Sequence, residues 1–240
     1  MVIDGFQDLL TGLITASAVL AAIMGFIVLE RFFHDKLEEL FSDSNYFIFF
    51  FLVVGYILYS LGEVALYLTS VVMKSASFPG ISDVYWVGGA LFILISFFAL
   101  TIQLVRNAPS LNKLPILLFF GLVVVAAVAG IILTITLGPG QHFLHYFYPI
   151  ASALIISFGF SVIIFSSQLG TMSSPLTLFF IASTCILIGD IFYTSILTSN
   201  AYGIAGLAAD LAYLGGYFLS FIAFLTMRWK FHTLPGKQQA

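Results

Sequence analysis

Seven long apolar stretches restrict the fold of this chain more than any other feature. They cover residues 8–30, 46–73, 83–105, 114–137, 145–168, 175–198 and 204–227. Each reaches the length of about 20 residues that a helix needs to cross the hydrocarbon core of a bilayer. Lipid leaves helices and closed barrels as the only spanning structures, and these stretches lack the alternation of barrel strands. The sequence therefore predicts an all-helical integral membrane protein, a seven-transmembrane-helix bundle that forms one domain over residues 1–240.

The composition excludes several classes of function. Only 8% of the residues are charged, whereas soluble domains carry about 25%. No basic cluster is present that could neutralise phosphates, so we expect the lipid bilayer as a partner and no nucleic acid. The single cysteine, Cys185, lies in an apolar stretch and is expected to be a small apolar side chain. The first ten residues hold two acids and no basic residue, so the first stretch is expected to stay rather than be cleaved.

Lysine and arginine predict the orientation. If the chain crosses seven times, seven of the eight basic residues fall on one side, namely Arg31, Lys36, Arg106, Lys113, Arg228, Lys230 and Lys237. Lys74 alone falls on the other side. The positive-inside rule then puts the N-terminus outside and the C-terminus in the cytoplasm, in the cell (cytoplasmic) membrane. Residues 30–45 mix charges of both signs at helical spacing, which predicts a helical extension of the first span or a docking surface for a cytoplasmic partner.

An internal repeat relates two parts of the chain. Residues 61–97 align with residues 188–224 without a gap. The alignment pairs Gly62 with Gly189, Glu63 with Asp190, Asp83 with Asp210, Trp86 with Tyr213, and Gly88–Gly89 with Gly215–Gly216. A weaker match links Ala16–Leu20 with Ala151–Ile155. The sequence therefore predicts two parallel three-helix repeats, residues 8–105 and 145–228, joined by a linker helix over 114–137.

The paired acids define a candidate ligand or ion site. Glu63 and Asp190 lie deep in their spans, where a carboxylate costs roughly 2.5–3.5 kcal/mol and usually faces a bundle interior or a wet cavity. We expect them to converge near the outer mouth of the bundle with further polar and aromatic residues: Asp83, Asp210, Tyr67, Tyr193, Trp86 and Tyr213. Two structural roles are open as alternatives. Asp83 and Asp210 could cap helices, and Glu63 and Asp190 could hydrogen-bond to a tyrosine or threonine of a neighbouring helix.

Two histidines form a second candidate site. His142 and His145 lie three residues apart at the outer start of the fifth span, and thus on one helix face. Such a pair can ligate a metal. The surrounding Phe143, Tyr146, Phe147 and Tyr148 also match an interfacial aromatic belt, which is the alternative role.

One family resemblance bears on function. The pattern Gly189-Asp190, Tyr193, Asp210, Tyr213-x-Gly215-Gly216-Tyr217, with Tyr148-Pro149, resembles the seven-transmembrane N-terminal sensor region found ahead of diguanylate cyclase and histidine kinase domains. That family usually carries a cytoplasmic catalytic domain, whereas this sequence ends at Ala240, and an acid of the family pattern is replaced by Ser152. The resemblance implies a non-enzymatic sensor or receptor-like module that signals through a separate partner.

Other functions are compatible with the same residues. A small-solute or cation- or proton-coupled transporter of three-plus-one-plus-three architecture is the first alternative, because intramembrane acids mark ion pathways. The seventh span contains no lysine, so we expect no retinal Schiff base and no other cofactor. An accessory subunit of a membrane complex is a further alternative. A metal-dependent intramembrane hydrolase would use His142, His145, Asp83 and Glu63. The sequence leaves open whether two copies associate.

Overall fold

Seven long helices make up the computed structural model of the chain, which describes residues 2–33, 40–75, 78–107, 114–135, 142–199 and 203–232. The helices are α1 (Val2–Phe33), α2 (Ser44–Tyr67), α3 (Ile81–Arg106), α4 (Leu114–Ile135), α5 (Leu144–Ile164), α6 (Ser173–Ser199) and α7 (Gly203–His232). The described residues contain no strand. The prediction of an all-helical chain is confirmed.

Within the described residues, six helical segments are long and apolar enough to cross a membrane: Gly5–Phe32, Ser44–Val72, Ile81–Arg106, Leu144–Ile164, Gly170–Thr194 and Gly203–Lys230. They coincide with six of the seven predicted spans, and they identify the chain as a multi-pass membrane protein. The remaining helix, α4, occupies the place of the fourth predicted span.

The ends of the helices differ from the prediction in several places. A π-helical turn, η2 (Leu68–Val72), continues α2, and two 3₁₀ turns, η4 (Ser166–Gln168) and η5 (Gly170–Met172), separate α5 from α6. Asp43 caps α2, because its carboxylate accepts hydrogen bonds from the backbone N–H groups of Asn45 (2.8 Å) and Tyr46 (3.2 Å). The helical extension of the first span is predicted over residues 30–45. The helix α1 reaches Phe33, residues 34–39 lie outside the described residues, and residues 40–42 form a turn before α2 begins at Ser44.

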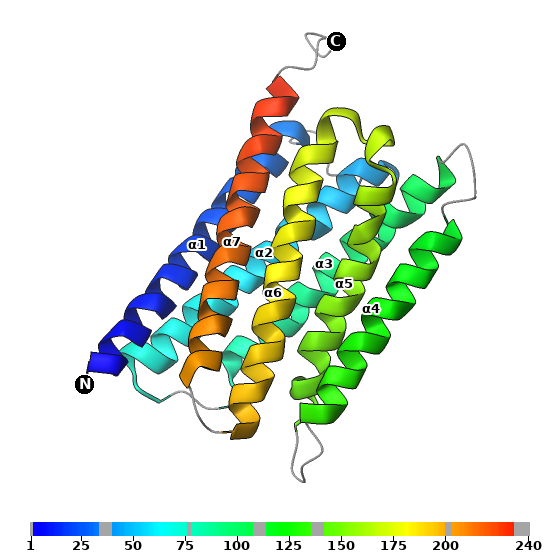
Figure 1. Cartoon of the computed structure of the whole chain (residues 1–240). Coiled ribbons are helices and arrows are strands. Elements are labelled where there is room, and N and C mark those ends of the chain that lie inside the picture. The colour runs from blue at the N-terminus through cyan, green and yellow to red at the C-terminus, as the bar shows by residue number, and fades with distance from the viewer. Residues whose placement is uncertain are drawn as a thin grey trace.

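Six of the helices form a closed ring. Going around the ring, α1 packs on α2, α2 on α3, α3 on α5, α5 on α6, α6 on α7, and α7 back on α1 (Figure 1). The helix α4 lies outside this ring, where it packs mainly on α5 (Figure 1). The fourth helix is therefore peripheral, and α3 and α5 contact each other directly.

Close helix crossings occur at glycines. A Cβ atom at Gly89 would lie 2.9 Å from the carbonyl oxygen of Gly55 and 2.6 Å from the Tyr59 ring. On the other side of the ring, a Cβ atom at Gly216 would lie 3.1 Å from the carbonyl oxygen of Ala182 and 2.8 Å from the Ile186 side chain. Only glycine therefore lets α3 approach α2, and α7 approach α6, so closely.

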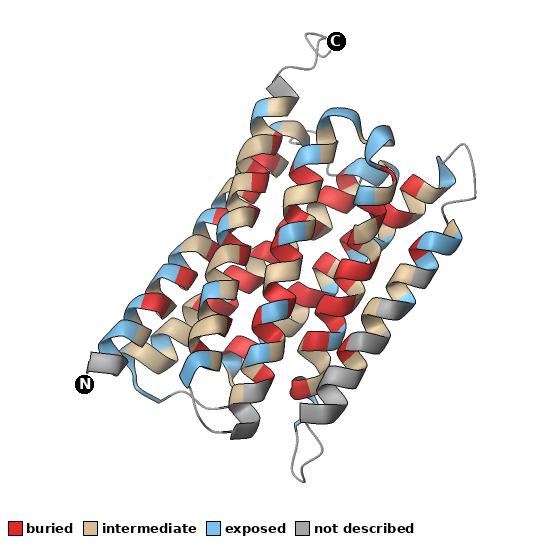
Figure 2. Ribbon diagram, viewed as in Figure 1, coloured by how far each residue is buried: buried red, intermediate tan, exposed pale blue. Residues whose placement is uncertain are grey.

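The half of the ring that contains the C-terminal end of α7 is filled by apolar side chains. Tyr56, Phe179 and Phe224 form its centre, with ring centroids 4.6–5.8 Å apart. Figure 2 shows the buried residues along the inward faces of the helices, while exposed residues lie on the outer faces and at the ends. This packed half closes the interior of the ring on one side.

Candidate functional site

A cavity of about 90 Å³ lies inside the other half of the ring. All six ring helices contribute to its wall, and α4 does not. Its lining residues are Thr11, Ile14, Tyr59, Glu63, Leu66, Trp86, Tyr148, Ile186, Asp190, Tyr193, Asp210, Tyr213 and Tyr217. The cavity thus combines three carboxyl groups with a largely aromatic wall.

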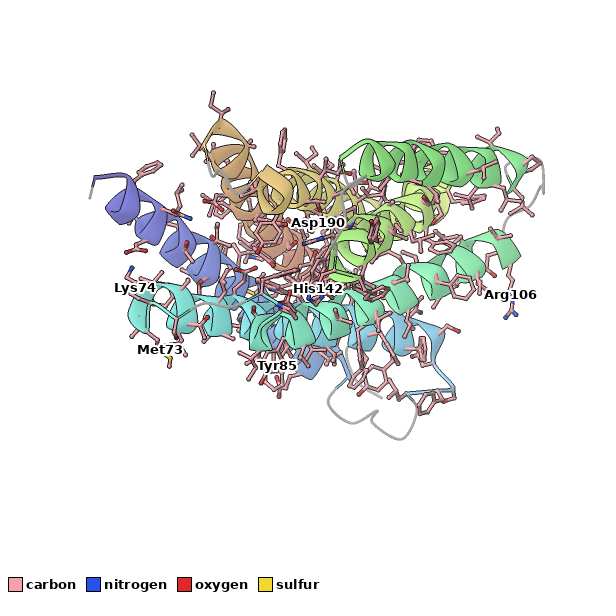
Figure 3. The ribbon with its side chains drawn as sticks, turned by 90° about the horizontal axis from the view of Figure 1, so that it is seen from below. Met73, Lys74, Tyr85, Arg106, His142 and Asp190 are labelled. Carbon is pink, nitrogen blue, oxygen red and sulfur yellow. The ribbon has the colours of Figure 1, made fainter. Side chains whose placement is uncertain are left out.

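Asp190 of α6 belongs to this wall, and its carboxyl group is held by two neighbouring helices. Its side chain is 7% exposed. The Ser152 hydroxyl of α5 donates to Oδ2 at 2.5 Å, and the Tyr213 hydroxyl of α7 donates to Oδ1 at 2.9 Å. Figure 3, which shows the molecule from below, places Asp190 toward its middle and Tyr85 on its outer side. A buried polar group needs such donors to offset the loss of water.

Glu63 of α2 has a similar environment. Its side chain is 5% exposed, and the Tyr217 hydroxyl of α7 donates to Oε1 at 2.8 Å. The Thr15 hydroxyl of α1 lies 3.3 Å from the Glu63 backbone carbonyl. Glu63 and Asp190 therefore line one cavity. Each of them also accepts a hydrogen bond from a tyrosine of α7, which is the structural role that the sequence left open as the alternative.

The other two predicted acids, Asp83 and Asp210, have different positions in their helices. Asp83 is the third residue of α3, where its Oδ2 accepts the backbone N–H of Gly80 at 2.6 Å, so it does cap its helix. Its Oδ1 also accepts the Tyr148 hydroxyl of α5 at 2.6 Å, so Asp83 lies behind a tyrosine of the cavity wall. Asp210 lines the cavity itself. The helix α7 begins at Gly203, seven residues earlier, so the capping role considered for Asp210 is wrong.

Three of the four aromatic candidates line the cavity, namely Trp86, Tyr193 and Tyr213. The fourth, Tyr67, is not among the lining residues, and its ring faces α1 near Gly12. Trp86 and Tyr213 have a second role, because each fills the space left by a glycine of the preceding helix, Gly62 and Gly189 respectively. The small glycine thus positions an aromatic ring at the cavity wall in both halves of the ring.

The two histidines lie together but away from the cavity. The ring of Phe78 stacks on His145 (centroids 5.1 Å apart) and contacts His142 edge-on (5.7 Å). Both ring nitrogens of His145 are buried without a hydrogen-bond partner in the described part of the chain. Within the same residues, no group of three or more His, Cys, Asp or Glu side chains is gathered closely enough to hold a metal ion.

Several cavity residues were not among the sequence candidates. Tyr148 and Tyr217 both donate to carboxylates, and Ser152 donates to Asp190. In the sequence they appear only in the sensor-region resemblance, which includes Tyr148, Tyr217 and the position of Ser152, and in the aromatic belt, which includes Tyr148, because tyrosines are common near membrane interfaces. The α1 residues Thr11 and Ile14 carry no chemical pattern at all.

No lysine or arginine is among the described residues that line the cavity. The eight lysines and arginines all lie near the ends of the spans or between them. Lys74, for example, forms an exposed ion pair with Asp8 at 2.7 Å, and Figure 3 shows Lys74 and Arg106 at opposite ends of the bundle. The carboxyl groups of Glu63 and Asp190 therefore accept hydrogen bonds from neutral hydroxyl groups.

Comparison with known proteins gives no relative. No protein-family model matches the chain, and neither a curated protein nor a solved structure matches it significantly. The geometry of the cavity is thus the main guide to function.

Proposed function

We propose that this chain is a seven-span, non-enzymatic ligand-binding module of the cytoplasmic membrane, with sensor-like output through a separate partner. The observation that carries the proposal is the cavity, because six helices from both parts of the chain place Glu63 and Asp190 in one polar wall. A concave pocket with a few converging polar groups is the usual form of a ligand site.

Matched contacts support two parallel three-helix units, α1–α3 and α5–α7, with α4 as the extra span between them in sequence. Gly62 faces Trp86 in the first unit, and Gly189 faces Tyr213 in the second. Gly89 faces position 55 and Tyr59, while Gly216 faces the aligned position 182 and Ile186. The same helix pairs therefore touch at aligned residues in both units. Such a relation fits a pseudo-twofold axis along the membrane normal.

The closed end of the cavity favours binding over permeation. Beyond Tyr59, the interior of the ring is occupied by the Tyr56, Phe179 and Phe224 rings. A solute in the cavity would have to displace this aromatic group to reach the opposite side. We therefore rank the transporter second.

The distribution of basic residues indicates which side of the membrane the cavity faces and where a signalling partner would bind. With the basic residues in the cytoplasm, the cavity half of the ring faces the outside, as expected for a receptor. A partner would then contact the cytoplasmic segment after α1 or the C-terminal segment, in line with the sensor-region resemblance.

A two-part experiment tests the proposal. The purified chain in nanodiscs is screened for thermal stabilisation by small neutral, acidic and basic solutes, and every stabilising solute is then tested for uptake into proteoliposomes. We expect at least one solute to raise the melting temperature, because ligands that bind only the folded state stabilise it, and we expect no uptake above that of empty liposomes. Uptake would establish the transporter instead. A panel without any stabilising solute would contradict a ligand-binding role.

A further inference from the structure

The composition of the cavity wall suggests the class of its ligand. Glu63 and Asp190 are buried acids that accept hydrogen bonds from neutral hydroxyl groups, and no lysine, arginine or histidine is among the described lining residues. Buried carboxylates are normally paired with a cation or coordinated. A positively charged ligand would provide such a pairing for Glu63 and Asp190. Resting on the function proposed above, we propose that the cavity binds a small organic ammonium group.

The aromatic wall favours an organic cation. Six aromatic side chains surround the acids: Tyr59, Trp86, Tyr148, Tyr193, Tyr213 and Tyr217. The faces of tryptophan and tyrosine attract cations, and recognition of ammonium ligands by aromatic cages is a common use of this attraction. The hydroxyl groups of Tyr213 and Tyr217 are engaged with the carboxylates, which fixes the position of their rings.

The spacing of the acids argues against a bare metal ion. A hard cation such as Ca²⁺ needs six or more oxygen ligands at one point. Among the described residues, no three acidic, histidine or cysteine side chains gather around a common point. The acids are instead distributed around a volume of about 90 Å³. A cavity of about 150 Å³ accommodates benzene, so this one suits about four non-hydrogen atoms.

The indole Nε1 of Trp86 adds a second preference. It lies beside the Glu63 carboxyl group and makes no hydrogen bond of full geometry among the described residues. A buried donor that is only partly satisfied favours an additional acceptor. A ligand that carries an oxygen next to its ammonium group would satisfy both the carboxylates and the indole. Protonated ethanolamine has this chemistry and four non-hydrogen atoms, and it serves as the probe.

Tryptophan fluorescence can report binding, because the chain has only two tryptophans. Trp86 lines the cavity, whereas Trp229 lies on α7 and is 69% exposed. In the Trp229→Phe variant, Trp86 is the single emitter. This variant is placed in phosphatidylglycerol nanodiscs, which contain no ammonium headgroup, and titrated with ethanolamine hydrochloride at constant ionic strength. Ethylene glycol serves as the neutral control for ethanolamine, and sodium serves as the inorganic-cation control. The Trp86→Phe variant shows whether the emission change comes from Trp86.

We expect a saturable change in Trp86 emission with ethanolamine. Binding should be at least tenfold weaker in Glu63→Gln and in Asp190→Asn. It should be unchanged in the control variant Asp8→Asn, because Asp8 pairs with Lys74 outside the cavity. Melting curves of each variant show that it is folded. A second arm uses phosphatidylethanolamine nanodiscs without added amine. If these alone reproduce the emission change, the ammonium group comes from a lipid headgroup rather than from a free solute.

Three results would overturn the ammonium assignment. These are an equal response to ethylene glycol, an equal response to sodium, and unchanged affinity in both carboxamide variants. Ethanolamine could leave Trp86 emission unchanged while a neutral or acidic solute of the stabilisation screen changes it. In that case the proposed ligand class is wrong and the ligand-binding function stands. If no solute affects either readout, both proposals fail.

Discussion

Alanine at Gly89 or at Gly216 is expected to lower the free energy of unfolding by about 1–3 kcal/mol. The new methyl group at position 89 would lie 2.9 Å from the Gly55 carbonyl oxygen, and the one at position 216 would lie 3.1 Å from the Ala182 carbonyl oxygen. Backbone atoms of a packed helix cannot rotate away, so the helices must separate. The effect is measured by denaturation of the purified protein in mixed micelles.

The adjacent glycines provide matched controls. No atom lies within 4 Å of a Cβ built at Gly215, and a Cβ at Gly88 would meet only the mobile end of Leu58 at 3.3 Å. Alanine at these sites should be neutral or stabilise the helix by about 0.5–1 kcal/mol, because glycine weakens helix interiors. If Gly216→Ala and Gly215→Ala behave alike, the close crossing of α6 and α7 described here is incorrect.

The hydrogen bond between Tyr217 and Glu63 should contribute more than a neutral bond of similar geometry. Tyr217→Phe removes the hydroxyl that donates to Glu63 at 2.8 Å and keeps the ring. Hydrogen bonds to charged groups contribute about 1.5–3 kcal/mol, so the loss should fall in this range.

The matched comparison is Tyr56→Phe. The Tyr56 hydroxyl interacts with the neutral Ser220 hydroxyl at 2.6 Å, in an equally buried position. Bonds between neutral groups contribute about 0.5–1.5 kcal/mol. Denaturation curves of both variants are compared under the same conditions. Equal losses would mean that Glu63 is bound as a neutral carboxylic acid, and they would remove the charge on which the ammonium assignment depends.

The spans could be predicted because lipid imposes a simple rule on length and hydrophobicity. The position of α4 could not. Its sequence, LPILLFFGLVVVAAVAGIILTI, is apolar on every side, so no face of it indicates a partner. Charge patterns also say nothing about which helices close the ring, and the contacts of α1 with α7 and of α3 with α5 required the structure.

The sequence could identify those site residues that are energetically unfavourable inside a membrane span. Glu63 and Asp190 could be selected from sequence because carboxylates are rare in spans. Tyr148, Tyr217 and Ser152 entered the sequence analysis only through the sensor-region resemblance and the aromatic belt, and their hydrogen bonds to the acids required the structure. The capping role left open for Asp210 does not hold, because the residues before it, Gly203–Ala209, form two further turns of α7.

The central claim is that Glu63 and Asp190 face one cavity, and cysteine labelling tests it most directly. In a Cys185→Ala background, Glu63→Cys and Asp190→Cys are made singly and together. Each is treated with a methanethiosulfonate reagent that transfers an ethyltrimethylammonium group of seven non-hydrogen atoms, and intact mass gives the number of labels per chain. The two truncations remove five non-hydrogen atoms from a cavity that suits about four, so the enlarged space holds one such group and not two. Glu63→Cys alone leaves room for about seven non-hydrogen atoms, and Asp190→Cys alone for about six. We predict one label on Glu63→Cys, incomplete labelling of Asp190→Cys, and one label on the double variant. Two labels on the double variant, or none on Glu63→Cys, would contradict a shared cavity.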